Sequence, residues 1–486
     1  MNNHCLAITI DVGTTNTKVS LYEIATGNLV DRKIFTTARK YDKYGELFDF
    51  EKIWDCIFNE LVGFVKKYPK AIDSISVASV GEAGVLIDQN GTIMTPLITW
   101  YDKRSKDYID CLTDEEMRLI YQITGLPIHT NYSISKIKWL VDYMLDSSEQ
   151  TYTWLNIPDL ICYLLTGKIC TEYSLASRTM AYDITKKCWS QRILDIFKLK
   201  EIVNFPKICQ AGEIIGYTDD LDNNDLKSEH ISVRIAGHDH MVGAYGIDLK
   251  ENELLNSTGT TEGLLCISQT NFLSRINVSS ALSNGVFVNN DYFSLFSSMP
   301  TGGSAFKWFN TLFKIDALEM AELCRILMQK CKTDDKFYKD SPFTIPHLNG
   351  SGAPKKDVNA KGLIYGLDIG TTREDLLKGI VLGLSLELKY IYAHFGAENT
   401  TSIKVIGPAI KNPLWLQVKA DVLNKDIIAL NIDESVSFGA LRLSYPYLKM
   451  NIKSKTYSPN QENQKYILQI YQDYVSLIEE KNRLSL

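Results

Sequence analysis

A glycine- and threonine-rich segment, Asp11–Lys18, directly follows a short apolar run near the start of the chain. Glycine and small hydroxylated residues let backbone N–H groups and hydroxyls approach phosphate oxygens closely. We therefore predict that Gly13, Thr14 and Thr15 bind phosphate, and that Lys18 neutralises part of its charge. Taken alone, the same segment also fits an ordinary surface hairpin.

A second segment of the same kind, Ser257–Gly263, follows another apolar run halfway along the chain. We expect Gly259, Thr260 and Thr261 to contact phosphate for the same reason. Two such turns, at matching places in two half-chains, could face each other across a cleft and hold the triphosphate of ATP from both sides. The chain has neither the GxxxxGKS/T loop of P-loop proteins nor the GxGxxG arrangement with a following acid that binds dinucleotides.

Asp239 stands among small residues just after an apolar β-type run at 233–236. A hydroxyl that attacks a phosphoryl group needs a carboxylate within hydrogen-bond reach to take its proton. We predict that Asp239 is this catalytic base and that it also contacts the substrate. Asp239 and Asp11 are further predicted to hold Mg2+, since hard cations prefer oxygen ligands. The alternative for Asp239 is a helix N-cap, a common role for aspartate.

These residues need strands and helices to position them. Apolar runs predict strands at 6–10, 19–22, 75–78, 84–88, 233–236, 254–256, 264–268 and 404–407. Helical periodicity predicts helices at 51–68, 135–145, 159–165, 304–313, 316–331, 375–395, 413–423 and 463–486. A strand–turn–strand unit therefore opens each half, as an ancient duplication would leave it. We place the domain boundary near residue 245, giving domains 1–245 and 246–486 with a short helical hinge between them.

Length and composition set the class of protein. The chain has 486 residues, of which 45% are hydrophobic and 23% charged, with a net charge of −6. That length suggests about two to four domains, and the acidic balance argues against nucleic acid or an anionic membrane as partner. No apolar stretch approaches ~20 residues and the N-terminus lacks a basic region, so we expect neither a membrane span nor a signal peptide. The ten scattered cysteines, without a CxxC pair, fit a cytoplasmic protein with reduced thiols.

The two turns and Asp239 belong to an ordered series of motifs that resembles the FGGY family of carbohydrate kinases, within the actin/hexokinase-like ATPase fold. Residues 11–15 and 257–263 are similar to its two phosphate motifs, and Asp239 falls where the family has its catalytic aspartate. The other matching segments are Trp100–Arg104, Leu165–Ser174, Thr301–Ser304, Gly362–Leu367, Asp375–Leu376, Pro413–Trp415 and Ser437–Ala440. Such a series is far more specific than any one short motif.

The resemblance implies an α/β fold of two ribonuclease H-like (actin-like ATPase) domains, each a mixed sheet flanked by helices, with a cleft between them. It implies ATP-dependent phosphorylation of a hydroxyl on a small sugar or polyol, with ATP and Mg2+ mainly on the C-terminal side and the sugar mainly on the N-terminal side. Gly302 and Gly303 would lie close to the nucleotide, and Gly407, Ala409 and Asn412 would form the adenosine loop. A homodimer is left open.

The adenosine loop departs from the family pattern of successive glycines. Pro408 fixes φ and removes an N–H group, and Ala409 stands in place of the last glycine. One interpretation is a variant loop with a shifted purine, which we favour because both phosphate turns and Asp239 are kept. The other is weakened nucleotide use, and its extreme is a non-catalytic, actin-like sugar or nucleotide sensor.

The acceptor pocket also departs from the relatives that the sequence resembles. Glu82 lines up with a glutamate of glycerol kinases, whereas Gly81 replaces their arginine and Asn131 replaces an aromatic residue. We predict that Glu82 and Asn131 bind the acceptor, because carboxylate and amide oxygens accept hydrogen bonds from hydroxyls; Asp102 of the Trp100–Arg104 segment would add another contact. The loss of the arginine and of the aromatic residue argues against glycerol as the acceptor. It favours a ketose, as in xylulokinases, with gluconate or another sugar acid or polyol as the alternative.

Overall fold

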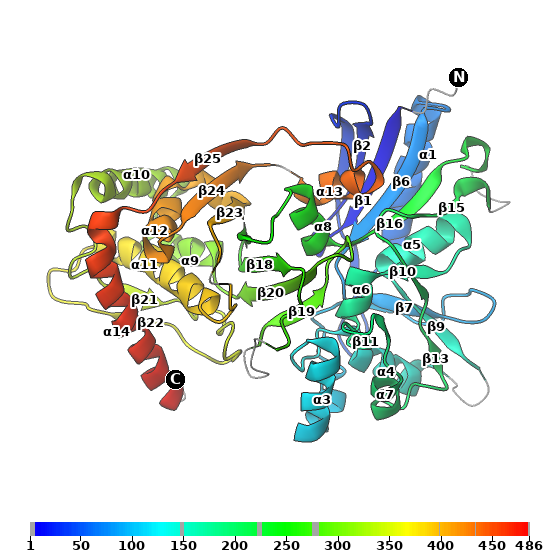
Figure 1. The fold of residues 1–486 in the computed structure, drawn as a ribbon, viewed down its shortest axis with the longest axis horizontal. Coiled ribbons are helices and arrows are strands. Elements are labelled where there is room, and N and C mark those ends of the chain that lie inside the picture. The colour runs from blue at the N-terminus through cyan, green and yellow to red at the C-terminus, as the bar shows by residue number, and fades with distance from the viewer. Residues whose placement is uncertain are drawn as a thin grey trace.

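The computed structural model describes residues 5–145, 150–220, 226–274, 281–397, 399–432 and 434–484. Each half of the chain contains one large mixed sheet with helices on its faces (Figure 1). The N-terminal sheet has the order β15-β16-β6-β1-β2-β3, with bounds Ile214–Tyr217, Ser232–His238, Ile72–Ser79, Leu6–Val12, Asn16–Glu23 and Leu29–Thr36. The C-terminal sheet has the order β19-β20-β18-β17-β23-β24-β25, with bounds Ser283–Val286, Phe293–Met299, Glu262–Ser268, Glu253–Thr258, Ser402–Ile406, Asp426–Asn431 and Lys453–Tyr457.

The two sheets share one topology. In the N-terminal half β1 pairs with β2 in antiparallel and with β6 in parallel orientation; in the C-terminal half β17 pairs with β18 and β23 in the same two ways. Both sheets then continue with a parallel strand, β16 or β24, and an antiparallel edge strand, β15 or β25. The two glycine- and threonine-rich turns therefore occupy the same place, at the carboxyl end of the first strand of each sheet.

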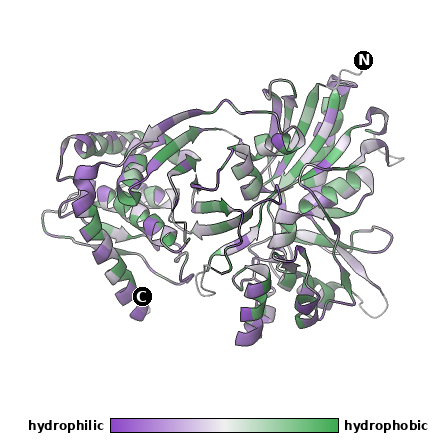
Figure 2. Cartoon of the chain, in the orientation of Figure 1, coloured by the Kyte–Doolittle hydropathy of each residue, from purple (hydrophilic) through white to green (hydrophobic). Residues whose placement is uncertain are grey.

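Helices cover the sheets because the central strands are apolar on both faces. All seven residues of β1 and all seven of β18 are buried, and Figure 2 shows hydrophobic residues along the sheets and hydrophilic ones on the outer helices. The helices are α1 Phe50–Lys67, α2 Lys106–Asp110, α3 Asp114–Thr124, α4 Ser133–Met144, α5 Ile157–Thr166, α6 Tyr173–Arg178, α7 Gln191–Ile196, α8 Asp239–Gly246, α9 Gly303–Phe313, α10 Ala317–Thr333, α11 Arg373–Tyr392, α12 Pro413–Leu423, α13 Ser435–Ser444 and α14 Gln464–Arg483. Within the described ranges, none of these is long and apolar enough to cross a membrane.

Both domains also contain shorter strands outside the two large sheets. They are β4 Arg39–Tyr41, β5 Glu46–Phe48, β7 Gly84–Ile87, β8 Leu97–Ile98, β9 Tyr152–Asn156, β10 Cys170–Glu172, β11 Tyr182–Asp183, β12 Cys188–Trp189, β13 Val203–Asn204, β14 Lys207–Cys209, β21 Phe343–Ile345 and β22 Leu363–Tyr365. Every helix and strand expected from the sequence lies within or overlaps an observed element, and α12 has the predicted bounds. The last two residues of the helix expected at 463–486 lie outside the described residues.

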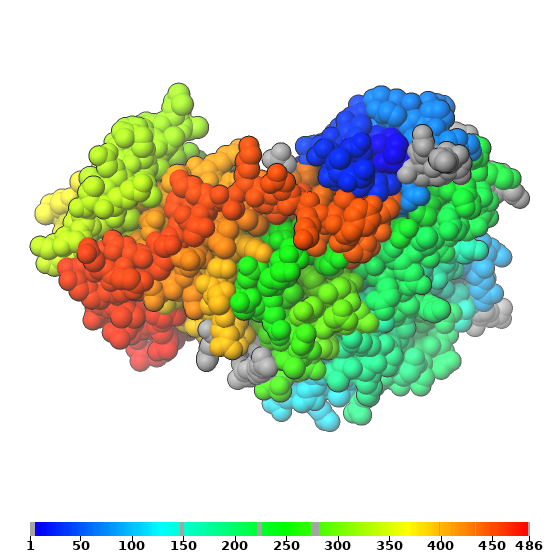
Figure 3. All heavy atoms as spheres, turned by 45° about the horizontal axis from the view of Figure 1, so that its top comes forward, coloured from blue at the N-terminus to red at the C-terminus, as the bar shows by residue number. Residues whose placement is uncertain are grey.

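The chain passes between the halves at α8 and returns at α13, and these two helices pack against each other. A Cβ atom at Gly246 would collide with the carbonyl oxygen of Ser435, and one at Gly439 would collide with that of Val242. Only glycine permits this approach. α13 also contacts β1 and β6 of the N-terminal sheet, and Figure 3 shows this late segment lying directly against the beginning of the chain.

A second connection joins the halves through β19, an edge strand of the C-terminal sheet. The amide N–H of Asn284 donates to the carbonyl oxygen of Gly125 at 2.9 Å, and the N–H of Val286 donates to Ser177 Oγ at 3.0 Å. The two halves are thus attached at α8–α13 and again at β19.

Candidate active site

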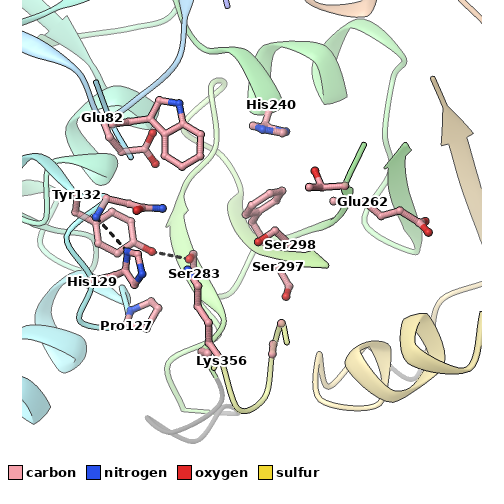
Figure 4. Close-up of a pocket in the computed structure, with 18 of the residues that line it drawn as sticks. Glu82, Pro127, His129, Tyr132, His240, Glu262, Ser283, Ser297, Ser298 and Lys356 are labelled. Atoms are coloured by element: carbon pink, nitrogen blue, oxygen red, sulfur yellow. Dashed lines mark hydrogen bonds between the residues drawn. The ribbon is translucent and has the colours of Figure 1, made fainter. Parts of the chain in front are cut away.

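A cavity of about 820 Å³ lies between the halves (Figure 4). The side chains and turns that line it come from both domains and from the α8 junction. They include Thr14, Glu82, Trp100, His129, Asn131, Tyr132, Arg178, His238, Asp239, His240, Thr258, Gly259, Thr261, Glu262, Ser283 and Lys356. The cavity therefore brings together both glycine- and threonine-rich turns, the expected base and two of the expected acceptor-binding residues.

Asp239 is the first residue of α8, and its neighbour His238 occupies the N-cap position. The Asp239 side chain is 20% exposed, on the cavity wall, and its Oδ1 accepts from the N–H of His240 at 2.7 Å. Burial raises the pKa of Asp239, and His240 opposes that shift. A raised pKa brings a carboxylate closer to the range in which a general base is effective.

His238 is buried directly beside Asp239. Its Nε2 lies 3.4 Å from Asp239 Oδ1, and burial holds the pKa of His238 well below its usual range. The imidazole is therefore neutral and places no positive charge beside the carboxylate. The hydrogen bond that orients the Asp239 carboxylate comes from the N–H of His240.

The first turn is rigid, and only Thr14 of its predicted residues lines the cavity. Trp100 Nε1 donates to Thr14 Oγ1 at 2.9 Å, and Thr37 Oγ1 donates to the carbonyl oxygen of Gly13 at 2.7 Å. Thr15 is exposed at the tip of the turn. The backbone of the turn is thus held in one conformation, with a hydroxyl directed at the cavity.

Asp11 and Lys18 lie behind this turn, and neither of them lines the cavity. Lys18 Nζ is 3.3 Å from Asp11 Oδ2 and 2.9 Å from Glu434 Oε2, so it bridges two carboxylates. Asp11 Oδ1 is buried without a hydrogen-bond partner. Burial raises the pKa of Asp11 to about 7; Lys18 lowers it and the nearby charge of Asp239 raises it again.

The second turn is held by the start of α9. The N–H of Gly302 donates to Thr260 O at 3.0 Å, and the N–H of Gly303 donates to Gly259 O at 2.8 Å. A Cβ atom at Gly303 would lie 2.6 Å from Gly259 O, so this approach requires glycine. Gly302 and Gly303 consequently act on the turn and lie outside the lining of the cavity.

A buried ion pair lies directly behind the second turn. Lys419 Nζ of α12 donates to Glu262 Oε2, and both side chains are completely shielded from solvent. Asn256 completes the cluster: its Nδ2 donates to Glu262 Oε2 at 2.9 Å and its Oδ1 accepts from Lys419 at 2.5 Å. The cluster fixes Glu262, the residue that follows Thr260 and Thr261.

The loop expected to bind adenosine packs against the same turn from its other side. The N–H of Ala409 donates to Thr258 Oγ1 at 3.1 Å, and a Cβ atom at Gly407, where φ is +91°, would collide with Thr258 O. The Ala409 side chain is buried in the C-terminal core, whereas Asn412 caps α12 by accepting from Trp415 N at 3.2 Å. These three residues support the turn but do not line the cavity.

On the acceptor side, Glu82 pairs with Arg178, a residue that sequence reasoning missed. Arg178 Nε donates to Glu82 Oε1 at 2.7 Å, and Nη2 contacts the same oxygen. A Cβ atom at Gly81 would collide with the ring of His238 and lie 3.0 Å from Arg178 Cγ. Arg178 therefore lies beside position 81, where the glycerol kinases have an arginine. The signal available in the sequence was its place four residues after Ser174, which belongs to a matched motif.

Asn131 lines the cavity on a segment that is organised by the buried Lys136. Lys136 Nζ donates to the carbonyl oxygens of Thr130 at 2.8 Å and Tyr132 at 3.1 Å, and also to those of Asn131 and Trp100. Burial lowers the pKa of Lys136 to about 7. The Lys136 side chain thereby holds four backbone carbonyl groups on the acceptor side of the cavity in place.

Asp102 differs from expectation, because it does not line the cavity. Its Oδ1 accepts from Arg104 Nε at 2.9 Å, and its Oδ2 accepts from the N–H of Glu46 at 2.9 Å. Both oxygens are therefore already occupied by protein donors. Asp102 ties two loops together, and we assign it a positioning role in place of the predicted acceptor contact.

Comparisons with known proteins agree over nearly the whole chain. Residues 6–246 match the family model described as FGGY family of carbohydrate kinases, N-terminal domain, and residues 254–445 match the corresponding C-terminal domain. The chain is 27% identical to the glycerol kinase of Saccharolobus islandicus (strain M.16.27) over 461 residues, which cover 91% of this chain and 88% of that protein. It is also 27% identical to the glycerol kinase of Enterococcus casseliflavus over 468 residues, with the same coverage.

Solved structures with the same fold include two from Lactobacillus acidophilus. The gluconate kinase superposes with a TM-score of 0.85 at 22% identity, covering 98% of each chain. The ligand-bound xylulose kinase superposes with a TM-score of 0.85 at 20% identity, covering 99% of this chain and 98% of that one. These likenesses confirm the predicted two-domain, actin-like fold.

Proposed function

Because the chain belongs to the FGGY family of carbohydrate kinases, we propose that its cavity holds ATP and a sugar or polyol, and that Asp239 takes the proton of the acceptor hydroxyl. One observation carries this proposal: the Asp239 carboxylate lies on the wall of a cavity that both glycine- and threonine-rich turns also line. A non-catalytic sensor would not need a carboxylate held there by the N–H of His240.

The transfer step follows from this placement. The acceptor hydroxyl oxygen attacks the γ-phosphorus of ATP, the bond from that phosphorus to the β–γ bridging oxygen breaks, and ADP leaves. The hydroxyl proton passes to Asp239. Most of the rate enhancement then comes from positioning and from stabilisation of the phosphate charge.

The donor side of the cavity is proposed to be the C-terminal domain, 246–486, with the N-terminal domain, 1–245, holding the acceptor. The N–H groups of Thr260 and Thr261 and the hydroxyl of Thr14 would contact phosphate oxygens. Gly302, Gly303 and the 407–412 loop would act by holding the second turn in shape and by flanking the nucleotide.

Mg2+ fits the residues present. Asp11 has a buried carboxylate oxygen without a partner, and the charges of Asp11 and Asp239 act on one another. Among the described residues no group of three or more metal-ligating side chains occurs, so phosphate oxygens and water would supply the other ligands, as is usual for Mg2+. The bound ion would neutralise phosphate charge.

For the acceptor, we propose a polyhydroxylated molecule larger than glycerol, held by Glu82, Arg178 and Asn131. The paired Glu82 and Arg178 offer an acceptor and a donor side by side, which suits neighbouring hydroxyls. Both a ketose, which the sequence favoured, and a sugar acid meet this requirement. The positive charge of Lys356, which lines the cavity, favours the sugar acid.

The test is a coupled ADP-release assay with ATP and Mg2+ against ketoses, aldoses, polyols and sugar acids. Acceptor-dependent ADP release that Asp239→Asn abolishes is the expected result. ADP release that is the same with and without every acceptor, from folded protein that binds ATP, would contradict the proposal.

A further inference from the structure

Lys356 brings a positive charge into the acceptor side of the cavity from the C-terminal domain. It lies on the segment between β21 and β22 and lines the cavity. Figure 4 shows its side chain reaching from that segment toward Ser283 and Tyr132, with His129 beside it. No ion pair to a carboxylate is formed by Lys356 within the described part of the chain.

The neighbouring charges leave Lys356 uncompensated. Glu82 is already paired with Arg178, and the charge of Asp357 acts on Lys481. Burial lowers the pKa of Lys356, and Arg178 lowers it further, while Glu82 opposes them. Lys356 itself is exposed, so its ammonium lies in a solvent-accessible part of the cavity. It stands near the Arg178 guanidinium and a Glu82 carboxylate that is already paired, a setting that attracts an anionic ligand.

The other groups around Lys356 are neutral hydrogen-bonding partners. Tyr132 OH and Ser283 Oγ lie 2.7 Å apart. Burial lowers the pKa of His129 to about 4, and Lys356 lowers it further, so this imidazole is uncharged at neutral pH. Lys355 and Asp357 also line the cavity and carry opposite charges, so the site around Lys356 keeps one net positive charge, with hydroxyls and an imidazole beside it.

We propose that the acceptor is a sugar acid whose carboxylate binds Lys356, with Tyr132, Ser283 and His129 as its neutral partners. This assignment rests on the proposed kinase function and names its substrate class. A carboxylate carries one negative charge and so matches one free ammonium, whereas a phosphate group would bring nearly two. Lys356 is therefore a specificity-determining residue.

The position of Lys356 also determines which hydroxyl reacts. In Figure 4, His240, the neighbour of Asp239, lies across the cavity from Lys356. A sugar acid that places its carboxylate at Lys356 would therefore present a hydroxyl remote from the carboxylate to Asp239. Its middle hydroxyls would face Glu82 and Arg178. The acceptor would bridge the two domains, because Lys356 belongs to one and Glu82 to the other.

The experiment compares gluconate with glucitol, the alditol that has a terminal hydroxyl in place of the carboxylate, as acceptors for ADP release. The wild-type protein is expected to prefer gluconate, and Lys356→Met is expected to lower kcat/KM for gluconate about 10- to 100-fold, mainly through KM, because a hydrogen bond to a charged group is lost. Activity with glucitol should fall far less, because its terminal hydroxyl carries no charge. Lys361→Met, which removes an exposed lysine of the same segment, serves as the control and should behave as wild type.

The outcomes separate this inference from the kinase function. Preference of the wild type for glucitol or a ketose, still dependent on Asp239, would overturn the inference and leave the kinase function standing. An equal loss with gluconate and glucitol in Lys356→Met would also overturn it. ADP release without any acceptor dependence would overturn both. Calorimetric binding of gluconate to Asp239→Asn, weakening with added salt, provides a second readout that needs no turnover.

Discussion

Lys419 and Glu262 form an ion pair that is completely shielded from solvent and stands directly behind the second glycine- and threonine-rich turn. Lys419 comes from α12, whereas Glu262 begins β18, so the pair joins a helix of the C-terminal core to the phosphate-binding edge of the sheet. Lys419 Nζ also lies 4.4 Å from the centre of the Trp415 ring. The turn therefore has an internal support that a surface hairpin lacks.

Removal of one partner of this ion pair should lower the free energy of unfolding. Lys419→Met leaves the Glu262 carboxylate buried without its counter-charge, which destabilises proteins by about 3–5 kcal/mol. Thermal unfolding should show a lowered Tm, and KM for ATP should rise if the protein is assayed below that temperature. The double variant Glu262→Gln/Lys419→Met should recover much of the loss, and exposed Lys465→Met should have no effect. Equal destabilisation by the single and double variants would contradict the argument.

Asp239→Asn should separate binding from chemistry. The amide keeps the size of the side chain but cannot take the hydroxyl proton, and general base catalysis contributes roughly 10²–10⁴-fold. We expect kcat to fall by that factor, while acceptor and ATP affinities measured by calorimetry change little. Near-normal turnover of the variant would show that another group is the base.

Arg178 and Glu82 should behave as a coupled unit in acceptor binding. Arg178→Met leaves Glu82 without its partner, and Glu82→Gln weakens the charge-assisted bond, so each should raise KM for the acceptor about 10-fold or more. KM for ATP should remain unchanged. In the double variant the effects should be less than additive, because both single variants break the same interaction. Unchanged acceptor dependence in Glu82→Gln would remove the pair from the pocket.

Asp159 should make stability depend on pH in the neutral range. Burial raises the pKa of Asp159 from 3.8 to about 7, so the folded protein keeps the proton while the unfolded chain releases it. The stabilisation is complete below about pH 4 and is lost as pH rises through 7, amounting to at most about 4 kcal/mol. Asp159→Asn stays neutral throughout, so its Tm relative to wild type should rise from pH 4 to pH 7.5. A difference in Tm that stays constant over this range would contradict the assignment.

The sequence alone predicted the parts that depend on local chemistry. The turn–strand units and α12 follow from apolar runs bounded by glycine, proline and asparagine, whereas the fold class follows from the resemblance to the FGGY family; the structure and the comparisons confirm them. β3 escaped prediction because it is an edge strand that is largely exposed, and its pattern is therefore not that of a buried strand. α13 escaped because its apolar residues face a domain that lies far away in sequence.

The residues missed in the site are those defined by long-range contacts. Arg178 is 96 residues from Glu82, and Lys419 is 157 residues from Glu262, so no local pattern connects either pair. Asp102 was predicted to contact the acceptor because it belongs to the Trp100–Arg104 segment, which resembles a family motif near the sugar. Its use by Arg104 and Glu46 becomes visible only when the loops are folded together.

The position of α13 has a consequence for biosynthesis. This helix packs on β1, and Phe438 and Leu441 bury Ala7 and Tyr22 in one small cluster. The ribosome reaches α13 only after about nine-tenths of the chain has been made, although domains generally fold as units, beginning with the N-terminal one. The first domain to leave the ribosome must therefore wait, with an apolar face uncovered, for almost the last helix to be synthesised, and during that interval it is a natural client for chaperones.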